Sequence, residues 1–85
     1  MADVTLSNGR EITFDLNAIS MLEYRGLFDD NQPRETDDEI LARAGGLTAA
    51  EYIGLGVLDF KRYNQAFFAK AREPVNDPKS ENASG

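Results

Sequence analysis

The first fifteen residues alternate between apolar and polar side chains, which is typical of β-strands with one buried face. The apolar members of this alternation are Val4, Leu6, Ile12 and Phe14. The pair Asn8-Gly9 marks the turn between the two runs. A two-residue turn would split the apolar side chains between two faces, whereas a three-residue loop over residues 7–9 keeps them together and pairs Val4 with Ile12. We therefore predict a β-hairpin with the three-residue loop, in which Gly9 adopts the left-handed conformation of a bulge.

Three later segments begin with a capping box, in which a Ser or Thr is followed three residues later by Glu. The three pairs are Ser20 with Glu23, Thr36 with Glu39, and Thr48 with Glu51. Each pair predicts the start of a short helix. The first helix should continue through Phe28, the second should end at Gly45-Gly46, and the third should stop near Gly54 or Gly56.

The longest expected helix begins with Asp59 as its cap and runs to about Arg72. The residues of its expected apolar face are Phe60, Tyr63, Phe67 and Ala71. Residues 74–85 are mostly polar and contain two prolines, a composition typical of a disordered tail. The chain is thus predicted to form a single α+β domain over residues 1–73. In this domain an N-terminal β-hairpin is followed by three to four short helices that pack on its apolar face.

The composition narrows the chemistry that the domain can perform. The chain has 85 residues, enough for one domain, and contains no His, Cys or Trp. Common zinc, copper and haem ligand sets need His or Cys, and Ser-His-Asp and Cys-His catalytic systems need a His base. The acidic run from Asp29 to Glu39 lacks the sixth-position Gly of a calcium-binding EF-hand loop. We therefore expect a protein that is not an enzyme and has no cofactor or metal.

The charge of the chain is unevenly distributed. The net charge of −6 argues against nucleic acid as a partner, since phosphates are neutralised by Lys and Arg. Residues 29–39 carry six acids against one Arg, whereas residues 59–73 carry four basic residues against two acids. This pattern indicates either two solvated faces of opposite sign or an acidic surface that docks a basic partner. No segment resembles a membrane span or a signal peptide, so we expect a cytoplasmic protein without membrane contact.

The aromatic residues of the last helix provide the clearest indication of a binding surface. Most aromatic side chains of the chain are expected in the core. Phe67 and Phe68, however, point about 100° apart on a helix, so a small core rarely covers both. One of them, or Tyr63, is therefore expected on an exposed apolar patch of the kind that marks protein interfaces. Asp37 and Asp38 are the candidate contacts within the acidic stretch.

Four segments of the chain together carry a family pattern: VTLSNGREITFDL, EYRGLFDD, ARAGGLTAAEYIGLGVLDFKRY and QAFFAKAREP. The most telling part is Gly46-Leu47-Thr48 followed by Glu51, Leu55 and Asp59. With this pattern, residues 4–78 resemble the short tail assembly proteins of long-tailed bacteriophages and prophages, a group that includes the tail assembly chaperones.

The resemblance implies a binding role without catalysis. Tail assembly chaperones coat the long helical tape-measure protein and help to recruit tail-tube subunits around it. Both proteins are therefore expected partners, in the cytoplasm of a bacterial host. Many copies on one client would also favour self-association, for which the edge of the hairpin is a candidate. The alternative is a small acidic phage-encoded inhibitor of a host nucleic-acid-binding or defence protein, which the length and charge of the chain suit equally well.

Overall fold

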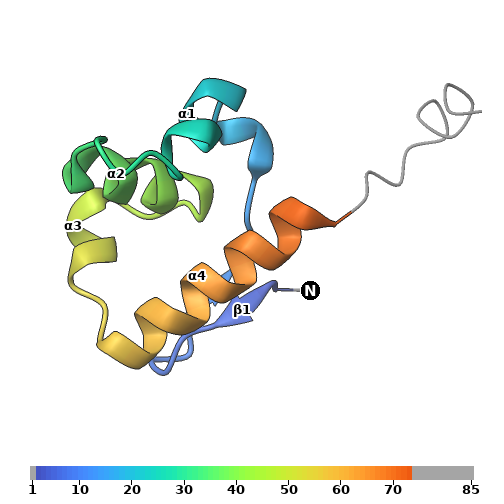
Figure 1. Cartoon of the computed structure of the whole chain (residues 1–85). Coiled ribbons are helices and arrows are strands. Elements are labelled where there is room, and N and C mark those ends of the chain that lie inside the picture. The colour runs from blue at the N-terminus through green and yellow to red at the C-terminus, as the bar shows by residue number, and fades with distance from the viewer. Residues whose placement is uncertain (1, 74–85) are drawn as a thin grey trace, which may run out of the picture.

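Residues 2–73 fold as an N-terminal hairpin followed by four α-helices, which confirms the α+β class (Figure 1). The computed structural model describes residues 2–73; the tail expected over residues 74–85 lies outside them. The elements in order are β1 (Val4–Thr5), β2 (Glu11–Ile12), the 3₁₀ turn η1 (Leu16–Ala18), α1 (Met21–Gly26), α2 (Arg34–Ala44), α3 (Ala49–Ile53) and α4 (Val57–Arg72). None of the helices in this part of the chain is long and apolar enough to cross a lipid bilayer.

The hairpin has the predicted register. Val4 lies opposite Ile12 in an antiparallel pair. The amide of Leu6 donates to the carbonyl of Arg10 at 2.8 Å across the loop, and Gly9 has a φ of 88°. A residue with a Cβ pays a steric cost at this φ, which is why glycine occupies the position.

Two of the three predicted capping boxes are confirmed. The side chains of Ser20 and Thr48 each accept a hydrogen bond from the backbone N–H three residues later. The carboxylate of the Glu at that later position accepts a hydrogen bond from the backbone N–H of the Ser or Thr. The third prediction is wrong, because α2 begins at Arg34, two residues before Thr36. Pro33 precedes the helix, and its φ of −58° suits the start of a helix. Proline also has no backbone N–H, so no donor is left without a partner at this position.

The start of α4 also differs from the prediction. The helix begins at Val57 with Gly56 as its cap, so Asp59 lies inside the first turn. The carboxylate of Asp59 accepts hydrogen bonds from the backbone N–H of Ser7 at 3.1 Å and from the Ser7 hydroxyl at 2.6 Å. A contact with the distant hairpin loop has therefore replaced the local capping role.

The core forms where α4 meets the hairpin and α2. Tyr63 and Phe67 are fully buried, and both pack edge-on against Phe14, with ring centroids 5.0 and 5.6 Å away. The Tyr63 hydroxyl donates to the carbonyl of Leu41 in α2, which satisfies this buried polar group. Burial raises the pKa of Tyr63, so its hydroxyl stays protonated and able to donate.

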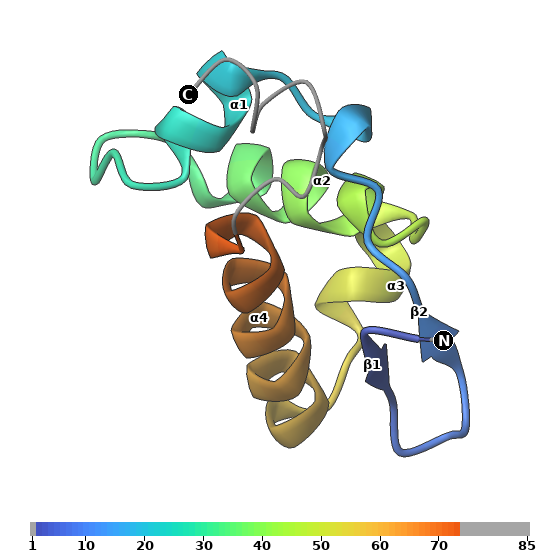
Figure 2. The same cartoon turned by 90° about the vertical axis from the view of Figure 1, so that its right-hand side faces the viewer.

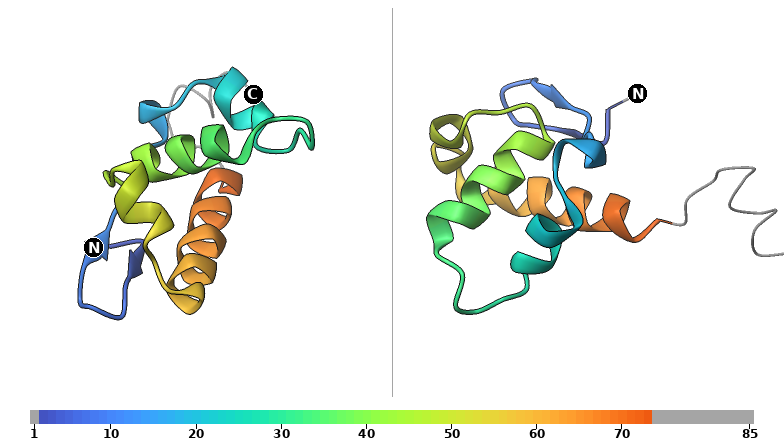
Figure 3. Two further views of the ribbon diagram at one scale, coloured as in Figure 1. Left: turned by 90° about the vertical axis from the view of Figure 1, so that its left-hand side faces the viewer. Right: turned by 90° about the horizontal axis from the view of Figure 1, so that it is seen from above.

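Polar contacts hold α4 against the hairpin near both of its ends. The Asp59–Ser7 pair lies near the start of the helix, and near its end the Lys70 ammonium contacts Asp3 at 2.7 Å and the Phe14 carbonyl at 3.0 Å. Strand β1 and α4 therefore run in opposite directions, as Figure 2 shows. Helix α2 approaches the first half of α4, at Tyr63, and α1 lies nearer the C-terminal half of α4, where Tyr24 packs near Phe67 (Figure 3).

The Asp59–Ser7 contact predicts how the stability of the domain depends on pH. Hydrogen bonds from Ser7, and then the nearby Arg62, lower the pKa of Asp59. The ionised carboxylate therefore contributes stability above its unfolded-state pKa of about 3.9, and this contribution is lost as the pH falls through the lower pKa of the folded state. Asp59→Asn should melt well below the wild type at pH 7, and the difference should shrink below about pH 4.

Thermal unfolding followed by circular dichroism between about pH 2.5 and pH 7 measures this difference. Glu11→Gln provides a control, since Glu11 is exposed and forms no side-chain hydrogen bond with the described residues. A gap in melting temperature between wild type and Asp59→Asn that stays constant across this range would contradict the assigned role of the Asp59 charge.

Candidate protein-binding surface

Helix α4 has a second apolar side besides its buried one. The buried side holds Asp59, Tyr63 and Phe67 and faces the hairpin. The second side, the α4 stripe, consists of Val57, Phe60, Asn64 and Phe68. These four residues are spaced i, i+3, i+7 and i+11, which places them in one line along the helix. Val57 is 72% exposed and Phe60 is 43% exposed, so much of this line is open to solvent.

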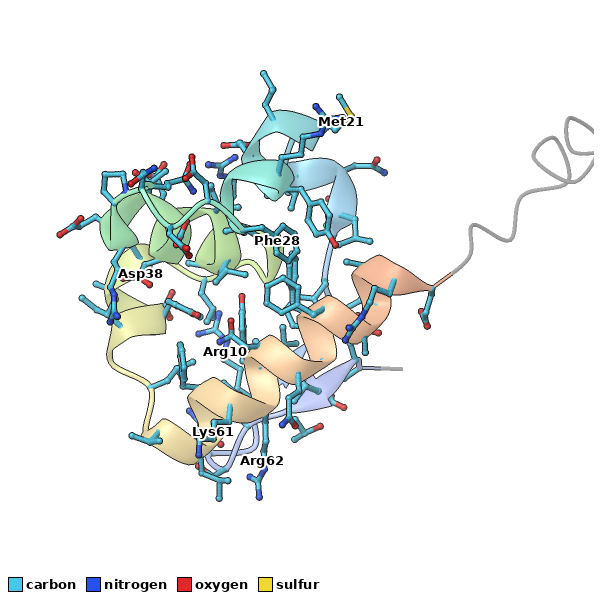
Figure 4. The ribbon with its side chains drawn as sticks, viewed as in Figure 1. Arg10, Met21, Phe28, Asp38, Lys61 and Arg62 are labelled. Carbon is cyan, nitrogen blue, oxygen red and sulfur yellow. The ribbon has the colours of Figure 1, made fainter. Side chains whose placement is uncertain are left out.

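Two shallow hollows adjoin the stripe. The α1 hollow, of about 350 Å³, is lined by Tyr24, Phe28, Asn64, Gln65, Phe68 and Arg72. The α3 hollow, of about 270 Å³, is lined by Asp38, Tyr52, Ile53, Leu55, Val57 and Phe60. Figure 4 shows Phe28 between α1 and α4, and Asp38 at the side of α2 and α3. The two hollows and the stripe together are called the α4 groove.

Aromatic stacking gives the α1 hollow a preformed apolar wall. The ring of Phe68 lies edge-on against the buried Phe67, with centroids 5.0 Å apart, and also contacts Phe28 at 5.7 Å. Phe28 in turn packs edge-on against Tyr24 at 5.3 Å. Because Phe28 is still 64% exposed, this cluster presents apolar surface to solvent while its rings are held in place.

Asn64 provides a polar group in the middle of the stripe. Its side-chain N–H₂ group donates to the Tyr52 hydroxyl and to the Phe60 carbonyl, both at 2.9 Å. These bonds fix the orientation of the amide and join the two hollows. The amide oxygen of Asn64 accepts no hydrogen bond from the described residues, so an acceptor remains available between two apolar sites.

Asp38 gives the α3 hollow its charge. The side chain is half-buried, and it forms no hydrogen bond or ion pair within residues 2–73. Burial, together with the neighbouring Asp37 and Glu35, raises the pKa of the Asp38 carboxyl. A cation brought to this carboxylate would offset the cost of its desolvation and the repulsion from the neighbouring acids.

The structure separates the sequence-predicted site residues. Tyr63 and Phe67 were expected as surface candidates, but both are 0% exposed, because their side of α4 packs on the hairpin and against Phe14. Of the three aromatic candidates, only Phe68 borders a hollow. Asp38 lines the α3 hollow. The neighbouring Asp37 does not line it, and its carboxylate accepts a hydrogen bond from the Gln32 side chain.

Several exposed apolar residues were not identified from the sequence as surface residues. The largest exposed fractions among them belong to Met21, Leu22, Phe28, Ile53, Val57 and Leu58. A signal for the stripe was present in the spacing of residues 57, 60, 64 and 68. The series of residues 60, 63, 67 and 71 has the same helical period, so the spacing alone did not single out the stripe.

Comparison of the chain with protein-family models, curated proteins and solved structures finds no match. Within residues 2–73, no group of three or more acidic side chains lies close enough together to hold a metal ion. The α4 groove is the candidate site on the described residues whose chemistry the proposal below considers.

Proposed function

We propose that this domain is a non-catalytic binding protein that covers an apolar helical segment of another protein. It acts in the manner of the tail assembly chaperones that its sequence resembles, with the tape-measure protein, the tail-tube subunits or both as clients in the cytoplasm of a bacterial host. The observation that carries the proposal is the α4 groove, in which exposed apolar side chains line two hollows along one helix.

Exposed apolar surface of this kind supports a client-binding role. Single exposed apolar side chains are normal, but grouped ones are typical of interfaces. A client that covers the exposed side chains of Phe28, Val57 and Phe60 would gain hydrophobic stabilisation, from which the cost of association is subtracted. A chaperone must also release its client when the tail tube assembles.

The test is a pull-down of the tagged chain from cells that express the rest of its native gene set, with the captured proteins identified by mass spectrometry. We expect recovery of a long helical tape-measure protein or of tail-tube subunits. Phe28→Ser should reduce this recovery, because Phe28 lines the α1 hollow. Leu22→Ser is the matched control, since Leu22 is 75% exposed but lines neither hollow of the groove.

Two outcomes would contradict this proposal. If the wild type recovered a host nuclease, polymerase or defence protein in place of tail proteins, the inhibitor alternative would replace it. If both variants recovered tail proteins as well as the wild type does, the α4 groove would not be the client-binding surface.

A further inference from the structure

We infer that the α4 groove receives one amphipathic helix that carries two apolar anchor residues two turns apart and a Lys or Arg beside the anchor in the α3 hollow. This inference rests on the proposed client-binding function and specifies the chemistry of the client segment. Three features of the groove support it: the distance between the hollows, the helix along which the groove runs, and the charge at its α3 end.

The spacing of the hollows matches the repeat of a helix. Phe60 borders the α3 hollow and Phe68 borders the α1 hollow. Eight residues separate them, which corresponds to about 12 Å along α4. On a client helix, residues seven or eight positions apart lie on the same side and about 10–12 Å from each other. Two such residues of a client lying along α4 would each enter one hollow.

The polar groups of the groove favour a helix over an extended strand. Buried backbone N–H and C=O groups need partners, and a helix satisfies most of its own. Between the two hollows the stripe offers the amide oxygen of Asn64, whose amide hydrogens are already engaged by Tyr52 and Phe60. Helix α4, along which the groove runs, pairs its backbone groups within the helix, so an extended client strand would find no sheet edge there to pair with. The Asn64 oxygen can accept from one polar side chain of a client helix, and a polar residue in an apolar seam fixes the register of the partner.

The charges give the groove a polarity. At the α3 end, Asp38 lies among apolar side chains and forms no ion pair with a described residue, so a client Lys or Arg would find an unoccupied carboxylate there. At the α1 end, Arg72 lines the hollow, and its Nε–H donates to the Phe68 carbonyl. A client helix with a basic residue near one anchor and none near the other would therefore bind in one direction.

Synthetic helical peptides test this inference directly. Two Ala-rich peptides of about 18 residues carry Leu at two positions seven apart and differ in one residue, a Lys or a Glu three positions before the first Leu. Binding of each fluorescently labelled peptide to the full chain is measured by anisotropy. We expect the Lys peptide to bind about tenfold more tightly than the Glu peptide, and Asp38→Asn to reduce this preference to about threefold or less.

Matched variants separate the groove from the remaining surface. Val57→Asp should weaken binding of the Lys peptide about tenfold, since Val57 lines the α3 hollow. Leu58→Asp should leave it unchanged, because Leu58 is similarly exposed in the same helical turn but lies off the stripe. A third peptide with its two Leu residues five positions apart should lose binding, because these residues project from different sides of a helix.

Contrary results would overturn either the Asp38 contact or the binding of a helix in the groove. Equal binding of the Lys and Glu peptides, or a preference that survives Asp38→Asn, would remove Asp38 as the charge contact. Absence of peptide binding to the wild type would reject the helix-in-groove inference. The pull-down of tail proteins would then still decide the proposed function separately. Peptide binding without capture of tail proteins would instead support the inference and reject the proposed clients.

Discussion

Replacing Phe67 by Ala is expected to remove a large fraction of the stability of the domain, whereas the same substitution at the neighbouring Phe68 is expected to remove little. Phe67 is 0% exposed and packs against Phe14 and Tyr24. Truncating a buried Phe costs about 3–5 kcal/mol, because apolar contacts are lost and a cavity remains. A domain of this size has a total stability of roughly 4–13 kcal/mol, so the loss is a large fraction of it.

Urea denaturation followed by circular dichroism provides the free energy of unfolding for both variants. Phe68 is half-buried at the α1 hollow, so Phe68→Ala should unfold near the wild-type urea midpoint and should show its effect in peptide binding instead. Equal large losses of stability at both positions would place Phe68 in the core and would remove it from the proposed binding surface.

Gly45→Ala is expected to destabilise the domain by roughly 2–4 kcal/mol, although its backbone conformation suits alanine. Gly45 ends α2 with a φ of −99°, where a Cβ causes no backbone strain. A Cβ at this position would, however, overlap the Tyr63 hydroxyl, and it would lie 2.8 Å from Tyr63 Cζ and 3.0 Å from Ile12 Cγ2. Both neighbours are buried, so relief requires displacing Tyr63 and weakening its hydrogen bond to Leu41.

The adjacent glycine provides the control for this prediction. Gly46 has a φ of 76°, and a Cβ there would meet open space, so Gly46→Ala should cost only the backbone strain of about 1–2 kcal/mol. If Gly46→Ala proved the more damaging of the two by urea denaturation, close packing would not be the reason for Gly45. In addition, Gly45→Ala should cost less in a Tyr63→Phe background, because the clashing hydroxyl is then absent.

The sequence by itself determined the features that depend on near neighbours. Alternation and the Asn8-Gly9 pair predicted the loop and register of the hairpin, because strand pairing across a short loop is fixed by local geometry. The capping boxes at Ser20 and Thr48 were also readable, since their hydrogen bonds join residues three positions apart. These local signals were sufficient for the α+β class.

The tertiary structure decided which of two equivalent patterns is used. The series 60, 63, 67, 71, which the sequence predicts as the apolar face, and the series 57, 60, 64, 68 both have the period of a helix, so the sequence left open which aromatic side chains of α4 stay exposed. Asp59 contacts Ser7, 52 positions away, and lies on the same buried side of α4 as Tyr63 and Phe67. The α4 groove is therefore a product of long-range packing, because the hollows beside its stripe are walled by residues from separate helices and the loop after α1.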